Sequence, residues 1–162
     1  MGLKILIGVD PRENKLLHPY IISHNTKKIN MLKEKSPTFK AMYEFIDASP
    51  RNYAIVIGRF ELNVFGQNRN GPAINYNPYM QVGCITNTRI FPEEAGLVHE
   101  IGHIYEHELR AIEGSKRPNK FIEEYNNLKH ERQIHKEMGW PDGRNSVEYW
   151  LDSKRVPNRW WP

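Results

Sequence analysis

One short run of the sequence has the residue types and spacing of a hydrolytic metal site. Residues 98–103 read Val-His-Glu-Ile-Gly-His, with His99 and His103 four positions apart and Glu100 between them. On an α-helix such positions lie on one face about one turn apart, so two imidazoles can bind one tetrahedral zinc ion. Glu100 then lies beside the open coordination position, where it can take a proton from zinc-bound water. We therefore predict Zn2+ bound by His99 and His103, with Glu100 as the general base.

A catalytic zinc site needs a third protein ligand, and the sequence downstream offers two carboxylates. The metzincin continuation fails because it requires Gly and His where this chain has Glu106 and Leu109. Glu124, Glu131 and His135 are spaced i, i+7 and i+11, which puts them on one face of a second helix. We expect Glu131 to be the third ligand, with Glu124 as the alternative. The carboxylate left over would orient a zinc-bound imidazole through its other ring nitrogen.

Amide hydrolysis also requires a donor that stabilises the negative charge of the tetrahedral intermediate. Zinc supplies part of this stabilisation as a Lewis acid, often helped by a Tyr, His or Arg side chain. The downstream candidates for this catalytic role are His135, Arg144 and Tyr149. For Arg144 and Tyr149, structural packing or a surface contact is an open alternative.

Two helices are predicted to position these residues. Pro92 followed by two carboxylates is typical of a helix start, and the helical pattern continues to about Ile112, ahead of Gly114. A second helix is predicted over residues 121–138, ending before Gly139.

The preceding residues are predicted to supply a small sheet and a helical segment. Strands are predicted over residues 4–9, 53–57, 62–65, 73–76 and 81–87. The second and third of these are expected to form a hairpin, and residues 66–72 a polar loop. Residues 27–47 have helical spacing, broken near Ser36 and Pro37. The fold class is therefore α+β, with a mixed or antiparallel sheet packed on the two downstream helices.

Composition excludes several other classes of protein. The single Cys84 among 162 residues rules out an intramolecular disulfide framework and a multi-thiolate zinc site. No apolar run is long enough to cross a bilayer, and the apolar stretch at the start is too short for a signal peptide. The formal net charge of +4 is mild and does not imply nucleic acid. We expect a monomer with a protein or peptide substrate, and no nucleic acid or membrane partner.

Beyond the metal motif, the sequence resembles the NleD group of type III secretion effector zinc metallopeptidases. The matching positions are Ile74–Pro78, His99–His103, Gly114, Glu123-Glu124, Glu131–Arg144 and Tyr149. The similarity covers about residues 50–150 and departs from the family pattern at Ile104, Arg132, His135 and Gly143. The resemblance implies a zincin-like metallopeptidase domain over residues 1–162, with an aromatic tail over 147–162, and supports Glu131 as the third ligand.

The same resemblance implies a protease that is secreted into the cytosol of a host or target cell; a cytoplasmic location is the alternative. Two other functions stay open. One is a non-catalytic binding module with structural zinc, whose contact surface would be the basic segment 110–120 and the Trp-rich tail. The other is a zinc hydrolase that acts on a non-peptide amide or ester.

Overall fold

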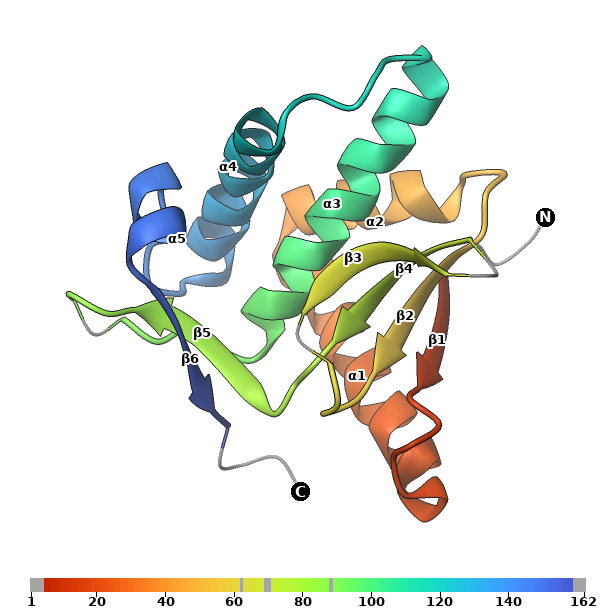
Figure 1. Ribbon diagram of the computed structural model, residues 1–162. Coiled ribbons are helices and arrows are strands. Elements are labelled where there is room, and N and C mark those ends of the chain that lie inside the picture. Colours follow the sequence, from red (N-terminus) through yellow and green to blue (C-terminus); the bar gives the residue numbers. More distant parts are fainter. Residues whose placement is uncertain (1–4, 62, 69–70, 88, 159–162) are drawn as a thin grey trace.

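The computed structural model describes residues 5–61, 63–68, 71–87 and 89–158, which form a mixed α+β fold (Figure 1). The helices are η1 (Lys15–Leu17), α1 (His18–Lys35), α2 (Pro37–Asp47), α3 (Glu94–Glu113), α4 (Lys120–Met138) and α5 (Ser146–Leu151). The strands are β1 (Ile5–Val9), β2 (Tyr53–Ile57), β3 (Val64–Asn68), β4 (Gly71–Tyr76), β5 (Met80–Cys84) and β6 (Ser153–Pro157). No helix in these described ranges is long and apolar enough to span a membrane.

The main sheet has the strand order β1-β2-β4-β3, with β1, β2 and β4 parallel and β3 antiparallel at one edge. In β2, buried Tyr53, Ile55 and Ile57 alternate with half-buried Ala54 and Val56. Because successive side chains of a strand point to opposite faces, this alternation identifies one face of the sheet as the core face. The buried residues of α1, α2 and α3 join the same core cluster, so these helices cover that face.

The expected hairpin between residues 53–57 and 62–65 is wrong, because β4 lies between β2 and β3. β3 instead forms its hairpin with β4, in which Phe65 pairs with Ile74. Part of the expected loop is therefore strand: β3 ends at Asn68, and β4 begins at Gly71, whose φ of +116° favours glycine. Leu62, at the start of the expected strand, lies outside the described residues.

The helical predictions agree better with the structure. The break near residue 36 is confirmed, since the Ser36 side chain accepts a hydrogen bond from the Phe39 N–H and caps α2. α1, however, begins at His18, with Pro19 in its first turn, well before the expected start at residue 27. α3 and α4 have nearly the expected bounds and end at Gly114 and Gly139, both left-handed.

The segment expected to be an aromatic tail contains two further elements. The Asn145 side chain forms a capping box with Glu148 and starts α5. β6 then pairs antiparallel with β5 in a separate two-stranded sheet. In Figure 1 this sheet and α5 lie on the opposite side of α3 from the main sheet. Residues 159–162 of the expected tail lie outside the described part of the chain.

Candidate metal centre

Three buried side chains from α3 and α4 converge on one point. Nε2 of His99 lies 3.2 Å from Nε2 of His103, and Oε1 of Glu124 lies 3.1 Å from Nε2 of His103. The other carboxylate oxygen of Glu124 lies 3.4 Å from Nε2 of His99. Donor atoms around a tetrahedral ion with bonds of about 2.0–2.1 Å are about 3.3 Å apart. His99, His103 and Glu124 could therefore hold a metal ion.

Glu131, the first choice for third ligand, occupies a different position from the one expected. Its Oε2 lies 3.0 Å from Nδ1 of His99, the ring nitrogen that faces away from His103. Its Oε1 accepts a hydrogen bond of 3.3 Å from Arg144. Glu124 and Glu131 are seven residues apart, or about 10 Å along a helix, so only one of them reaches the two Nε2 atoms. The alternative, Glu124, is the one that does.

The second imidazole also faces a carboxylate, that of Glu123, to which the sequence analysis gives no role of its own. Oε1 of Glu123 lies 3.4 Å from Nδ1 of His103, and Glu123 in turn accepts hydrogen bonds from Arg117 at 2.7 and 3.2 Å. Both imidazoles therefore face a carboxylate on the nitrogen that points away from the cluster, and both carboxylates pair with an arginine. Such partners fix the tautomer and orientation of a metal-binding ring.

The carboxylates around the imidazoles make the cluster strongly attractive to cations. Burial opposes protonation of His99, but hydrogen bonds to Glu124 and Glu131 prevail and raise the pKa of His99 to about 10. Burial also opposes protonation of His103, but Glu123 and Glu124 prevail and raise the pKa of His103 to about 9. Metal binding would compete with protonation of these imidazoles, so metal affinity should rise with pH.

Glu100 lies within the same buried stretch of α3 but has no partner comparable to those of the imidazoles. It is 4% exposed, and its Oε2 makes no hydrogen bond within the described residues. Burial raises the pKa of Glu100 above its usual value, although the neighbouring imidazoles oppose the shift. A buried, uncommitted carboxylate of raised pKa that faces a cavity is suited to exchanging a proton.

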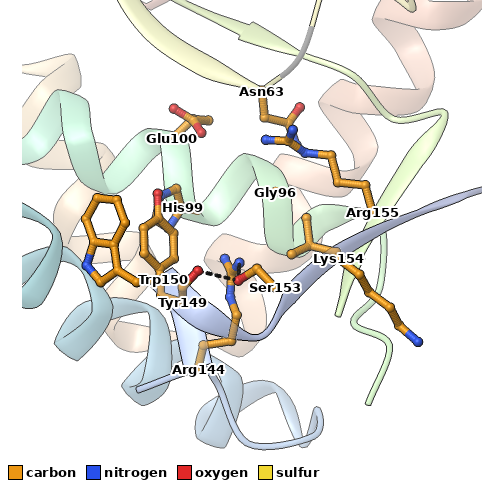
Figure 2. Close-up of a pocket in the computed structure, with 11 residues that line it drawn as sticks. Asn63, Gly96, His99, Glu100, Arg144, Tyr149, Trp150, Ser153, Lys154 and Arg155 are labelled. Atoms are coloured by element: carbon orange, nitrogen blue, oxygen red, sulfur yellow. Dashed lines mark hydrogen bonds between the residues drawn. The ribbon is translucent and has the colours of Figure 1, made fainter. Parts of the chain in front are cut away.

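Two cavities meet at Glu100, His99 and Tyr149. We call the first, of about 470 Å³, the Arg155 cavity; Asn63, Gly96, Arg144 and Arg155 line it (Figure 2). We call the second, of about 410 Å³, the Arg117 cavity; Phe65, His103, Arg117 and Glu124 line it. The cluster therefore lies in the wall of a continuous groove between α3, β3 and α5.

The three candidates for charge stabilisation lie at different distances from this groove. Tyr149 lines both cavities, and its ring stacks on His99 with the ring centroids 5.3 Å apart. Arg144 lines the Arg155 cavity and lies 4.9 Å from the centre of the Tyr149 ring. His135 is fully buried, donates its Nδ1–H to the carbonyl of Pro141 and lines neither cavity. The structure thus brings Tyr149 and Arg144 to the groove, and not His135.

Close contact between α3 and α4 depends on Gly102. A Cβ at this position would lie 1.7 Å from Oδ1 of Asn127, whose Nδ2 donates a 2.9 Å hydrogen bond to the carbonyl of His99. The missing side chain lets α4 approach near enough for Glu124 and Glu131 to reach His99. Asn127 was not foreseen as part of the site, although an isolated Gly inside a helical pattern is a known sign of close packing.

A second group of possible metal-binding side chains, Cys84, Glu148 and Asp152, lies between β5 and α5. Here the Arg89 guanidinium donates to Sγ of Cys84 at 3.4 Å and to Glu148 at 2.6 Å. Asp152 accepts hydrogen bonds from the backbone and side chain of Thr86. An arginine therefore already supplies positive charge to this cluster.

Comparison of the chain with family models, with curated proteins and with solved structures found no match. Its function is therefore inferred from the chemistry of its own side chains.

Proposed function

We propose that this chain is a zinc-dependent endopeptidase, with His99, His103 and Glu124 as the zinc ligands and Glu100 as the general base. The observation that carries the proposal is the convergence of ligand atoms from His99, His103 and Glu124, all within 4.8 Å of one another, beside a buried carboxylate with an unpartnered oxygen. Three protein ligands leave the fourth position open, which distinguishes catalytic from structural zinc sites.

When bound, zinc supplies a Lewis acid and lowers the pKa of a coordinated water. Glu100 would accept a proton from the attacking water on its unpartnered Oε2 and return it to the leaving amine. Glu131 and Glu123 hold the two imidazoles in the orientation that metal binding requires. Tyr149, stacked on His99 between the two cavities, is the best-positioned donor for the developing oxyanion.

The edge strand β3 supports an extended peptide as the substrate. β3 ends the main sheet, and Val64 and Phe65 line the Arg117 cavity next to Glu100. An edge strand offers unpaired backbone groups to which an extended segment can add as a further strand. The NleD-like identity, and with it action inside a host cell after secretion, is part of the same proposal.

Replacement of the general base tests the mechanism. We expect Glu100→Gln to lower cleavage of a casein or peptide-library substrate at least 100-fold, since general-base catalysis contributes about 10²–10⁴-fold. The variant should still bind zinc, because Glu100 is not a ligand; elemental analysis checks this. Glu113→Gln is the matched control, because it removes a carboxylate from the exposed end of the same helix. Undiminished turnover in Glu100→Gln would exclude the mechanism.

A further inference from the structure

The Arg155 cavity is lined by more positively charged than negatively charged side chains. Three cationic side chains line it, Arg144, Lys154 and Arg155, against the single carboxylate of Glu100. Glu100 is assigned to proton transfer, and Arg144 already pairs with Glu131 and donates to Ser153. The remaining positive charge of the cavity therefore comes from residues of β6.

The pleat of β6 determines which of its side chains enter the cavity. Successive residues of a strand point to opposite faces, so Ser153 and Arg155 share one face and Lys154 takes the other. Figure 2 agrees: the Arg155 side chain extends across the cavity toward Asn63, whereas the Lys154 side chain points away from it. Antiparallel pairing with β5, in which Arg155 lies opposite Val82, holds the strand in this register.

Arg155 has no hydrogen bond or ion pair with any residue in the described part of the chain. Asn63 lies beside it (Figure 2). Oδ1 of Asn63 accepts the Asn77 N–H at 2.6 Å, so the other side-chain atom, Nδ2, is a donor. That donor lies against Gly96, where a Cβ would be only 2.4 Å away. The cavity therefore presents a guanidinium and an amide donor side by side, next to His99, and neither is hydrogen-bonded to an acceptor within the described residues.

We propose that the Arg155 cavity binds a carboxylate of the substrate on one side of the scissile bond. The inference rests on the proposed endopeptidase function and adds a substrate class to it. A planar guanidinium can donate two parallel hydrogen bonds to a carboxylate, which gives directional recognition as well as charge. The carboxylate comes from an Asp or Glu side chain near the scissile bond or from the C-terminus of the substrate.

Matched peptides test this inference on the zinc-loaded full chain. We would first identify cleaved peptides in a random library, then compare versions with Glu, Gln or Lys at each position next to the scissile bond, all with amidated C-termini. At one of these positions kcat/KM should be about tenfold or more higher for Glu than for Gln, as expected for one hydrogen-bonded ion pair. Arg155→Glu should abolish this preference and favour Lys at the same position.

Lys40→Glu is the matched control, because it reverses one charge at an exposed position of α2 that lines neither cavity. It should keep the preference for Glu. Peptides with a free C-terminus form the second arm: faster cleavage of the free acid than of the matching amide, lost in Arg155→Glu, would assign the carboxylate to the substrate C-terminus.

Two results would overturn the inference. One is that the wild type cleaves Glu and Gln peptides equally and also cleaves free-acid and amidated peptides equally; the other is an unchanged preference in Arg155→Glu. In either case peptides are still cleaved and the endopeptidase proposal stands. No cleavage of any peptide by the zinc-loaded wild type would instead overturn the proposed function, and this inference with it.

Discussion

Each of the two imidazoles in the candidate metal centre faces a carboxylate that pairs with an arginine. His99 is linked through Glu131 to Arg144, and His103 through Glu123 to Arg117. Each arginine stabilises the ionised form of its carboxylate, and each carboxylate directs the opposite ring nitrogen toward the metal position. Arg144 and Arg117 also line the two cavities, so the residues that pair with Glu131 and Glu123 lie beside the groove.

Zinc binding can test whether Glu124 is the ligand and Glu131 the carboxylate that orients His99. Glu124→Ala removes a ligand, and we expect its zinc affinity to fall by more than 100-fold. Glu131→Gln keeps a hydrogen-bond acceptor near His99 and should lower the affinity by about 10–100-fold, as is typical of partners behind the ligands. Competition with a chromogenic chelator measures both, and Glu34→Gln on the exposed face of α1 is the control. A greater loss in Glu131→Gln would identify Glu131 as the ligand.

The sequence predicted which side chains gather around the two imidazoles better than it predicted which carboxylate reaches their Nε2 atoms. Helical periodicity correctly put Glu124 and Glu131 on one buried face of α4. Helical periodicity does not tell where along its length α4 contacts α3. That position decides which carboxylate of α4 reaches the Nε2 atoms of the two imidazoles. Adjacent Glu123 was missed because consecutive helical residues point about 100° apart, although a long side chain on the rim of the buried face still reaches His103.

The close contact between α3 and α4 at Gly102 should contribute to the stability of the protein. Gly102→Ala should destabilise the protein by roughly 1–3 kcal/mol, because the new methyl group overlaps Asn127. In an Asn127→Ala background the overlap disappears, and the same change should be neutral or stabilise by up to about 1 kcal/mol through helix propensity. Urea unfolding of the metal-free proteins measures this double-mutant cycle. Equal costs in both backgrounds would mean that Asn127 does not set the helix spacing.

Elements with strong local signals were predicted, and those that depend on distant partners were not. α3 and α4 have start and stop residues within their own sequences, so their bounds could be read directly. The position of β4 between β2 and β3 depends on parallel pairing with residues about 20 positions away, which alternation alone does not reveal. α5 and β6 are too short for periodicity, yet they supply Tyr149 and Arg155 to the groove.

Across the whole molecule, Glu137 joins the end of α4 to the start of α2. Its carboxylate accepts hydrogen bonds from the Ser36 hydroxyl and from the backbone and hydroxyl of Thr38. Burial opposes ionisation, but these hydrogen bonds prevail and lower the pKa of Glu137 to about 2. The N-terminal helices are thereby tied to the helix that carries Glu124.

This contact should make stability depend on pH. A carboxylate whose pKa is lower in the folded state contributes stability above its unfolded pKa, near 4.5, and loses it as pH falls toward about 2. We expect Glu137→Gln to unfold about 1–2 kcal/mol more easily than the wild type at pH 7, with the difference shrinking below pH 4.5. Urea titrations from pH 7 to pH 3 measure it. A constant difference over that range would contradict the assignment.

The thiol of Cys84, the single cysteine of the sequence, allows local opening near the groove to be measured by its rate of chemical labelling. Cys84 is fully buried at the end of β5, where it pairs with Ser153 of β6, two residues before Arg155. Because the side chain is buried, a thiol reagent can reach its sulfur only when the structure around the end of β5 opens. The rate of labelling therefore reports local opening of the ribbon that carries Arg155. A bound peptide that contacts Arg155 should slow this rate. The labelling rate of Cys84 therefore measures how often this wall of the groove opens, with and without bound peptide.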